Sequence, residues 1–114
     1  MMKNSVILVT RYGMGDAPEE LRLKLIGSYL SLMNSTDTLL PNAICFYADG
    51  VKLAVEGSPV LEALQSLEAR GVRLILCGTC LNWFGLTDRL RVGIVGGMTD
   101  IIEAQRLADK VITL

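Results

Sequence analysis

The stretch Gly71-Val72-Arg73-Leu74-Ile75-Leu76-Cys77-Gly78-Thr79-Cys80-Leu81-Asn82-Trp83 joins an apolar run to a Cys-x-x-Cys motif. Residues 72–76 are apolar except for Arg73, and the run is too short for a stable helix. It therefore predicts a strand that is buried on both faces, as strands of parallel sheets are. Ligands and reactive groups of open α/β sheets gather at the carboxyl ends of such strands, which is where Cys77 follows.

The residues after this strand predict a short helix. Gly78 permits a tight turn, Thr79 is a suitable N-cap, and Gly85 ends a helical segment over residues 80–84. The N-terminus of a helix carries about half a positive charge, which favours a thiolate over a thiol. The thiolate is the nucleophilic form of cysteine, so the position predicts a reactive sulfur.

Cys77 and Cys80 are therefore the candidate catalytic residues, and the amides of Gly78 and Thr79 are candidate binding groups for a thiolate or persulfide anion. The alternative is that the cysteines are small buried hydrophobic residues, which is the role expected of Cys45 within its apolar run. A structural zinc site needs four ligands, and the chain has three cysteines and no histidine. We expect no metal site within one chain, although an oligomer could pool several cysteine pairs.

Composition predicts one domain over residues 1–114 with an aliphatic core. Apolar residues make up 51% of the chain and aromatic residues only 5%, which suits parallel strands between helices. So large an apolar share in a small domain also favours a homo-oligomer. The net charge is −1 and no basic run occurs, so we expect no nucleic-acid partner.

Nothing in the sequence resembles a signal peptide or an apolar segment of membrane-spanning length. We therefore expect no membrane association and a cytoplasmic location, where cysteine pairs are redox-active or sulfur-handling more often than structural. No cofactor is indicated.

Strand and helix patterns alternate along the chain. Strands are expected at 5–10, 43–47, 72–76, 92–95 and 111–114. Helices are expected at 19–33, 59–70, 80–84 and 100–109, with a helical turn at 87–90. This alternation predicts an α/β fold, a three-layer α/β/α sandwich with a mostly parallel five-stranded sheet.

Polar residues mark the expected helix starts. Asp16 with Glu19 resembles a capping box, and Ser58 and Thr99 are suitable N-caps. The buried stripe of helix 19–33 is expected at Leu21, Leu25, Tyr29 and Leu32, widened by Ile26, Leu30 and Met33. The inward residues of helix 100–109 are expected to be Ile101, Ala104, Leu107 and Ala108.

The loop after the first strand contains Gly13 and Gly15, which are further candidate binding residues. It lacks both the Gly-Lys-Ser/Thr ending and the full Gly-x-Gly-x-x-Gly pattern of phosphate-binding loops. An ordinary strand-to-helix turn is therefore the favoured interpretation, with a small ligand near Gly13, Gly15 and Gly97 as the alternative. Three interpretations of Trp83 are open: it packs in the core, lines the thiol site, or anchors a subunit interface.

Several segments resemble the YedF-type branch of the DsrE/DsrF-like family. They are Phe46-Tyr47-Ala48-Asp49-Gly50-Val51-Lys52-Leu53 with Glu56-Gly57-Ser58, Leu67-Glu68-Ala69-Arg70-Gly71-Val72, and Cys77-Gly78-Thr79-Cys80-Leu81 with Phe84-Gly85-Leu86. The resemblance runs from the first strand to the final Lys110-Val111-Ile112-Thr113-Leu114.

This resemblance implies a small α/β/α domain that forms dimers, trimers or hexamers. It also implies that some members relay sulfur as a cysteine persulfide between donor and acceptor proteins. Their sulfur-carrying cysteine stands eight residues before a glycine at the end of this strand, as Cys77 does before Gly85. Cys80 is then the additional cysteine of the YedF-type pattern.

The leading hypothesis is a sulfur-transfer protein in which Cys77 carries the sulfane sulfur and Cys80 resolves the persulfide. The runner-up is a thiol–disulfide oxidoreductase or redox sensor that uses the same pair, although Gly-Thr between the cysteines and the lack of a cis-proline signature differ from thioredoxin-like proteins. A third hypothesis is a non-catalytic binding or assembly module.

Overall fold

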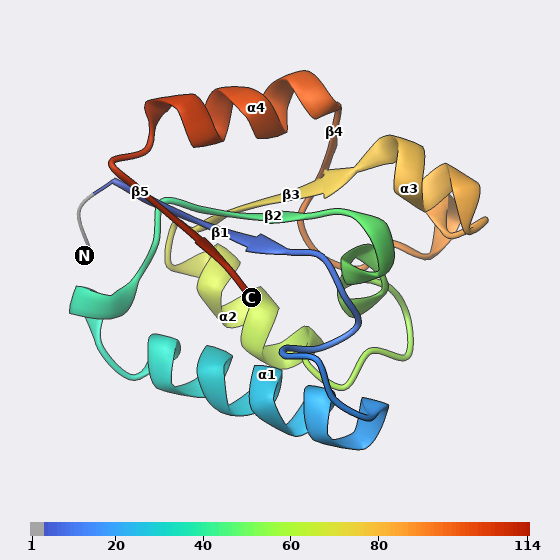
Figure 1. Ribbon diagram of the computed structural model, residues 1–114, viewed down its shortest axis with the longest axis horizontal. Helices are drawn as coiled ribbons and strands as arrows, with labels where there is room; N and C mark the ends of the chain where they lie inside the picture. Colours follow the sequence, from blue (N-terminus) through green and yellow to red (C-terminus); the bar gives the residue numbers. More distant parts are fainter. Residues whose placement is uncertain (1–3) are drawn as a thin grey trace.

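The computed structural model describes residues 4–114, so residues 1–3 of the expected domain lie outside the described part. Five strands form one sheet in the order β4-β3-β2-β1-β5, and every neighbouring pair is parallel (Figure 1). They are β1 (Ser5–Val9), β2 (Ala43–Phe46), β3 (Arg73–Cys77), β4 (Ile94–Gly96) and β5 (Lys110–Thr113). The predicted five-stranded parallel sheet is confirmed.

Helices cover both faces of this sheet. They are α1 (Glu19–Asn34), α2 (Leu61–Ala69), α3 (Gly78–Trp83) and α4 (Met98–Leu107), with 3-10 turns η1 (Asp37–Leu39), η2 (Ala48–Ala54) and η3 (Thr87–Arg89). Figure 1 shows α1 and α2 on one face and α4 on the other. Right-handed crossovers explain why the helices lie on different faces. The chain steps in one direction from β1 to β4, which places α1 and α2 on one face, and it then returns in the opposite direction to β5, which places α4 on the other. The predicted three-layer sandwich is therefore confirmed.

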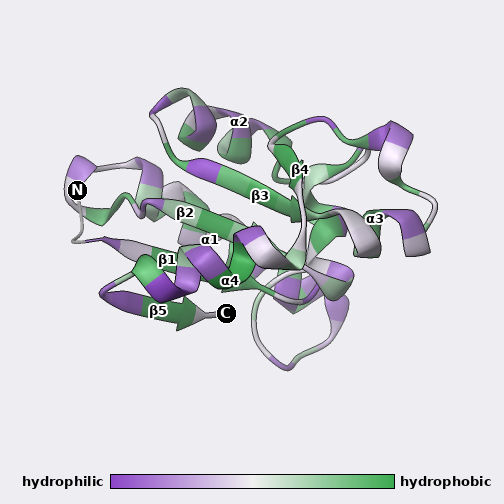
Figure 2. Ribbon diagram, turned by 90° about the horizontal axis from the view of Figure 1, so that it is seen from above, coloured by the Kyte–Doolittle hydropathy of each residue, from purple (hydrophilic) through white to green (hydrophobic). Residues whose placement is uncertain are grey.

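The core is aliphatic, as the composition predicts. All residues of β1 and β2 are buried, and β3 is buried from Leu74 onward. Figure 2 shows these three strands as the apolar centre of the molecule. Cys45 is 0% exposed within this core, so its predicted packing role is confirmed. Among residues 4–114, no helix combines the length and the apolar character needed to cross a bilayer.

The buried stripe of α1 differs from the expected one. Ile26, Leu30 and Met33 face the sheet, whereas Leu21, Leu25 and Leu32 are exposed. The expected stripe is therefore wrong at those three leucines, because the two apolar stripes lie side by side and only packing decides between them. Leu107 of α4 is likewise exposed rather than inward, since the helix ends at that residue.

Three of the expected N-caps are also wrong. Helix α1 follows Pro18, with no side-chain cap from Asp16 and with Glu19 as its first residue. Helix α2 begins at Leu61, because the Ser58 hydroxyl accepts instead from the Val60 amide in the preceding turn, at 3.2 Å. Helix α4 follows Gly97, whose amide donates to Asp100 Oδ2 at 2.8 Å, so Thr99 lies inside the helix.

The carboxyl ends of the strands meet at one edge of the sheet, where η2 crosses the end of β1. A Cβ atom on Gly50 would lie 2.1 Å from the carbonyl oxygen of Val9, so only glycine allows this approach. The amide of Tyr47 donates to the same carbonyl oxygen at 3.1 Å. Turn η2 is therefore held between the loop that follows β1 and the helix that follows β3.

Candidate functional site

Cys77 is the last residue of β3 and also the N-cap of α3. Its sulfur accepts a hydrogen bond from the amide of Cys80 at 3.4 Å. The expected cap at Thr79 and helix start at Cys80 are therefore wrong: α3 begins at Gly78, because the Cys77 side chain takes the capping role. The predicted position of the cysteines, where a buried strand passes into a short helix, is confirmed.

The two sulfurs differ in their exposure and in their partners. Cys77 is 2% exposed, whereas Cys80 is partly exposed. The Cys80 sulfur accepts a hydrogen bond from the amide of Ala48 at 3.1 Å. Both cysteines are reduced, and each sulfur accepts a hydrogen bond from a backbone amide. Reagents approaching from solvent therefore meet Cys80 first.

Burial raises the pKa of Cys80, and its hydrogen bond with the Cys77 sulfur raises that pKa further. The amide of Ala48 opposes this shift because it stabilises the thiolate. The raised pKa keeps the Cys80 thiol protonated at neutral pH. Helix α3 has only six residues, so the Cys80 amide is the local group that stabilises negative charge on the Cys77 sulfur.

The other predicted binding residues lie in different surroundings. Gly78 and Thr79 form the first turn of α3, but the amide that reaches Cys77 is that of Cys80. Gly13 has a φ of 121° and is buried against α1, where a Cβ would lie 2.5 Å from Arg22 Cβ. Its amide donates to Arg11 O at 2.8 Å. Gly13 therefore shapes the loop and does not offer a free amide, and Gly15 beside it also has a positive φ.

Trp83 is the last residue of α3 and is 84% exposed, so the interpretation that it packs in the core is wrong. Lys52 forms an ion pair with Asp49 at 2.7 Å and lies 4.3 Å from the centre of the Phe84 ring, just beyond α3.

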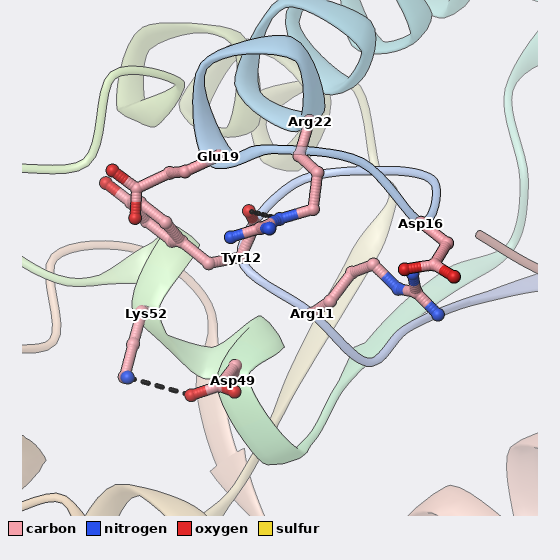
Figure 3. A pocket seen from close by; sticks show the side chains of 7 residues that line it. All are labelled: Arg11, Tyr12, Asp16, Glu19, Arg22, Asp49 and Lys52. Atoms are coloured by element: carbon pink, nitrogen blue, oxygen red, sulfur yellow. Dashed lines mark hydrogen bonds and ion pairs between the residues drawn. The ribbon is translucent and has the colours of Figure 1, made fainter.

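A pocket of about 400 Å³ lies between the loop after β1, the first turn of α1, and η2 (Figure 3). Its charged lining consists of the cations Arg11, Arg22 and Lys52 and the carboxylates Asp16, Glu19 and Asp49. Tyr12 completes the lining. Three positive and three negative side chains balance, which makes the pocket strongly polar but not anionic or cationic as a whole.

Sequence reasoning missed this pocket and the contact between Ala48 and Cys80. Ala48 is the one non-glycine residue with a positive φ, 51°, within residues 4–114. The Asp49-Gly50 pair signals a turn, but not that the turn folds back over β1 toward the cysteines. Only the close approach of Gly50 to Val9 fixes that placement.

Comparisons with known proteins agree with this architecture. No curated protein matches the chain. Among solved structures, it resembles the YchN protein of E. coli with a TM-score of 0.70 and 23% identity, covering 100% of both chains. It resembles MTH1491 of Methanobacterium thermoautotrophicum, a protein of unknown function, with a TM-score of 0.69, 22% identity, and coverage of 98% of this chain and 99% of that one.

A third structure, BT1422 of Bacteroides thetaiotaomicron, is a conserved protein of unknown function. It gives a TM-score of 0.67 at 13% identity and covers 97% of this chain and 95% of its own. At these identities the likeness concerns the fold alone. The sequence model of the DsrE/DsrF-like family, in contrast, matches residues 3–114, and the chain therefore belongs to the DsrE/DsrF-like family.

Proposed function

We propose that this chain is a sulfur-transfer protein that carries sulfane sulfur on its Cys-Gly-Thr-Cys site. The observation that supports this most directly is the pairing of two reduced cysteines, each bonded to a backbone amide, at the carboxyl end of β3. The DsrE-like family is associated with sulfur relay in general, which favours sulfur transfer among the reactions open to a cysteine pair. We assign the carrier role to Cys77 and the resolving role to Cys80.

In the loading step, the thiolate of Cys77 attacks the outer sulfur of a donor persulfide, R–S–SH. A sulfur–sulfur bond forms at Cys77, the bond in the donor breaks, and the donor leaves as R–S⁻. Cys77 is only 2% exposed, so its sulfur must become more accessible during loading. This burial favours donors that bind to the surrounding surface.

In the delivery step, an acceptor nucleophile takes the outer sulfur and Cys77 returns to a thiolate. When no acceptor is bound, Cys80 attacks the inner sulfur of the Cys77 persulfide. Hydrosulfide leaves, a Cys77–Cys80 disulfide remains, and a cellular thiol restores both cysteines. We place this chemistry in the cytoplasm, where thiols are kept reduced.

Mass spectrometry after incubation with a persulfide donor tests the assignment. Wild type should gain one sulfur atom on Cys77, and C80S should keep that atom longer because the resolving thiol is missing. C77S should gain none, while C45S, the matched control in the core, should behave as wild type. Equal loading of C77S would overturn the assignment, and reversible two-electron oxidation without sulfur gain would favour a thiol–disulfide protein.

We also propose a homo-oligomer that forms through the edge of the sheet at β4. This edge strand leaves backbone groups unpaired, and Ile94, Val95, Met98 and Ile102 are all exposed beside it. A second copy of this chain would cover both the edge and these side chains. Sedimentation should therefore give a mass above one chain for wild type and a lower mass for V95K.

A matched control for the oligomer is L32K, since Leu32 is equally apolar and exposed but lies on α1 across the sheet. Its sedimentation should equal that of wild type. A monomeric wild type, or an unchanged mass for V95K, would contradict the proposed interface.

A further inference from the structure

We propose that the pocket between the β1–α1 loop and η2 binds the carboxylate and ammonium groups of an amino-acid persulfide, and so presents the sulfur donor to the cysteine pair. The choice of a sulfur-bearing ligand rests on the proposed sulfur transfer. The zwitterionic character of the ligand rests on the pocket alone.

The balance of charge in the pocket indicates the class of ligand. Its volume of about 400 Å³ is within the usual range of small-molecule sites. Three cationic and three anionic side chains line it, so a phosphate or nucleotide gains no net attraction. A small zwitterion, in contrast, finds a partner for each of its two charges.

Some of these charges are already engaged within the protein. Arg22 donates to Ala17 O at 2.7 Å and to Tyr12 O at 3.2 Å, and so holds the loop. Lys52 is paired with Asp49 at 2.7 Å. These contacts build the walls of the pocket and leave the remaining charges for a ligand.

The charges that remain are one cation and two carboxylates. The Nε of Arg11 is buried and has no hydrogen-bond partner within residues 4–114. Asp16 and Glu19 make no ion pair with any residue of the same part of the chain. Figure 3 shows Glu19 beside Tyr12 on one side of the pocket and Arg11 with Asp16 on the other. A ligand carboxylate pairs with the Arg11 guanidinium that lines the pocket, and a ligand ammonium faces Glu19.

Turn η2 connects this pocket to the cysteines. Asp49 lines the pocket, and the preceding residue, Ala48, donates its amide to the Cys80 sulfur at 3.1 Å. Lys52 also lines the pocket and lies 4.3 Å from the centre of the Phe84 ring, which follows α3. One turn therefore forms both a wall of the pocket and a cover of the thiol site, with roughly 3.8 Å between successive Cα atoms of Ala48 and Asp49.

The group transfer is the loading step described above, with the amino-acid persulfide as R–S–SH. The thiolate of Cys77 forms a bond to the outer sulfur, the sulfur–sulfur bond of the donor breaks, and the amino-acid thiolate leaves. The leaving thiolate takes a proton from solvent, and no oxidant or reductant is consumed.

Binding is tested without chemistry in the C77S/C80S variant, with L-cysteine as the probe under reducing conditions. Amide resonances of residues 11–22 and 48–52 should shift on titration. Two matched probes each lack one charge: 3-mercaptopropionate lacks the ammonium, and cysteamine lacks the carboxylate. Each should bind at least about tenfold more weakly than L-cysteine, as expected when a charged hydrogen bond is missing.

Variants assign each charge to its partner. Adding R11Q should weaken L-cysteine binding at least about tenfold but leave cysteamine binding unchanged, since cysteamine has no carboxylate. Adding E19Q should weaken cysteamine and leave 3-mercaptopropionate unchanged. A dispersed amide spectrum before titration shows that each variant is folded. No shift with L-cysteine, or tighter binding of inorganic phosphate than of L-cysteine, would overturn the inference.

Loading rates then separate this inference from the proposed function. With intact cysteines, R11Q should load more slowly than wild type from L-cysteine persulfide but equally fast from inorganic polysulfide. Equal loading of R11Q from both donors overturns the pocket as the donor site while sulfur transfer stands. Binding of L-cysteine without loading from either donor overturns sulfur transfer and supports the zwitterion site.

Discussion

Gly50 is the residue whose replacement best tests how the site is held together. In G50A the new Cβ would lie 2.1 Å from the carbonyl oxygen of Val9 and 2.7 Å from its carbon. That carbonyl already accepts from the amide of Tyr47 at 3.1 Å, so it cannot move without weakening this hydrogen bond. Turn η2 must therefore shift by roughly 1 Å, which is overpacking against backbone rather than against a flexible side chain.

The expected loss of stability follows from these contacts. Overpacking costs about 1–3 kcal/mol, and a weakened backbone hydrogen bond adds about 1 kcal/mol. We therefore expect G50A to lose about 2–4 kcal/mol of unfolding free energy while remaining folded, since small domains have about 5–15 kcal/mol. Urea unfolding should be followed by far-UV circular dichroism, because Trp83 is 84% exposed in the folded chain and is a poor fluorescence reporter.

The displacement of η2 in G50A should also change the surroundings of Cys80. Displacing η2 moves Ala48, whose amide now contacts the Cys80 sulfur, so that sulfur loses a partner and part of its cover. Cys80 should then react faster with iodoacetamide in folded G50A than in folded wild type. Faster alkylation together with lower stability would link the turn to the site.

Gly27 provides the matched control. It lies inside α1, and a Cβ there would meet nothing within 4 Å. G27A should therefore gain about 0.5–1 kcal/mol from the higher helix propensity of alanine, with Cys80 reactivity unchanged. If G50A were as stable as wild type, or if it alkylated Cys80 at the wild-type rate, the reasoning from η2 to the thiol site would be refuted.

Two further predictions concern the cysteines. Burial raises the pKa of Cys45 from 9.0 to about 11, although Arg73 lowers it slightly, so the folded state favours the neutral thiol. The neutral thiol therefore contributes to the free energy of unfolding fully below about pH 9, and this contribution is lost as pH rises toward 11. Wild type should lose about 2–3 kcal/mol more than C45A over that range, and parallel pH curves for the two proteins would contradict the prediction. In the folded protein, Cys80 should be alkylated first, Cys77 more slowly, and Cys45 only on unfolding. The alkylation rate of Cys80 should keep rising into alkaline pH because its pKa is raised. Alkylation of Cys77 should be faster in C80A than in wild type. Mass spectrometry that found Cys77 modified first would contradict this order.

Much of the fold could be predicted because its strands are short apolar runs buried on both faces. The runs that contain Ile7, Ile44 and Ile75 could not form stable helices of their own, and each became a strand within a residue of its expected bounds. The order of the strands could not be predicted in the same way. The run Val111-Ile112 would suit either edge of the sheet, and only the return crossover over α4 places β5 beside β1.

Helix starts were harder to predict, because a cap contributes only about 1 kcal/mol and tertiary contacts outweigh it. Thr79 is a better cap than cysteine by propensity, yet Cys77 takes the position because β3 carries it to the edge of the sheet. The same helix therefore begins two residues earlier than expected. This early start brings the Cys80 amide to the Cys77 sulfur, a contact absent from the predicted arrangement.

The pocket could not be predicted, because its residues are unremarkable one at a time. Arg11 and Lys52 are 41 residues apart and become neighbours in a pocket only after η2 has crossed the end of β1. Charged residues in loops are usually solvated, and nothing in their spacing signals that three cations and three carboxylates share one cavity. The informative signal is a glycine, Gly50, whose lack of a side chain is required by a backbone atom of another strand.

Ala48 shows why this arrangement points to function. A non-glycine residue in the left-handed region costs of order 1–2 kcal/mol, and such strain persists only where the surrounding structure imposes it. Here the imposing contacts are the Tyr47 amide on Val9 O and the Gly50 amide on Tyr47 O, one on each side of Ala48. A glycine at position 48 would avoid that cost, but it would leave the backbone free to turn its amide away from Cys80. The strained alanine keeps that amide on the sulfur, so the costly conformation occurs where the pocket meets the thiol site.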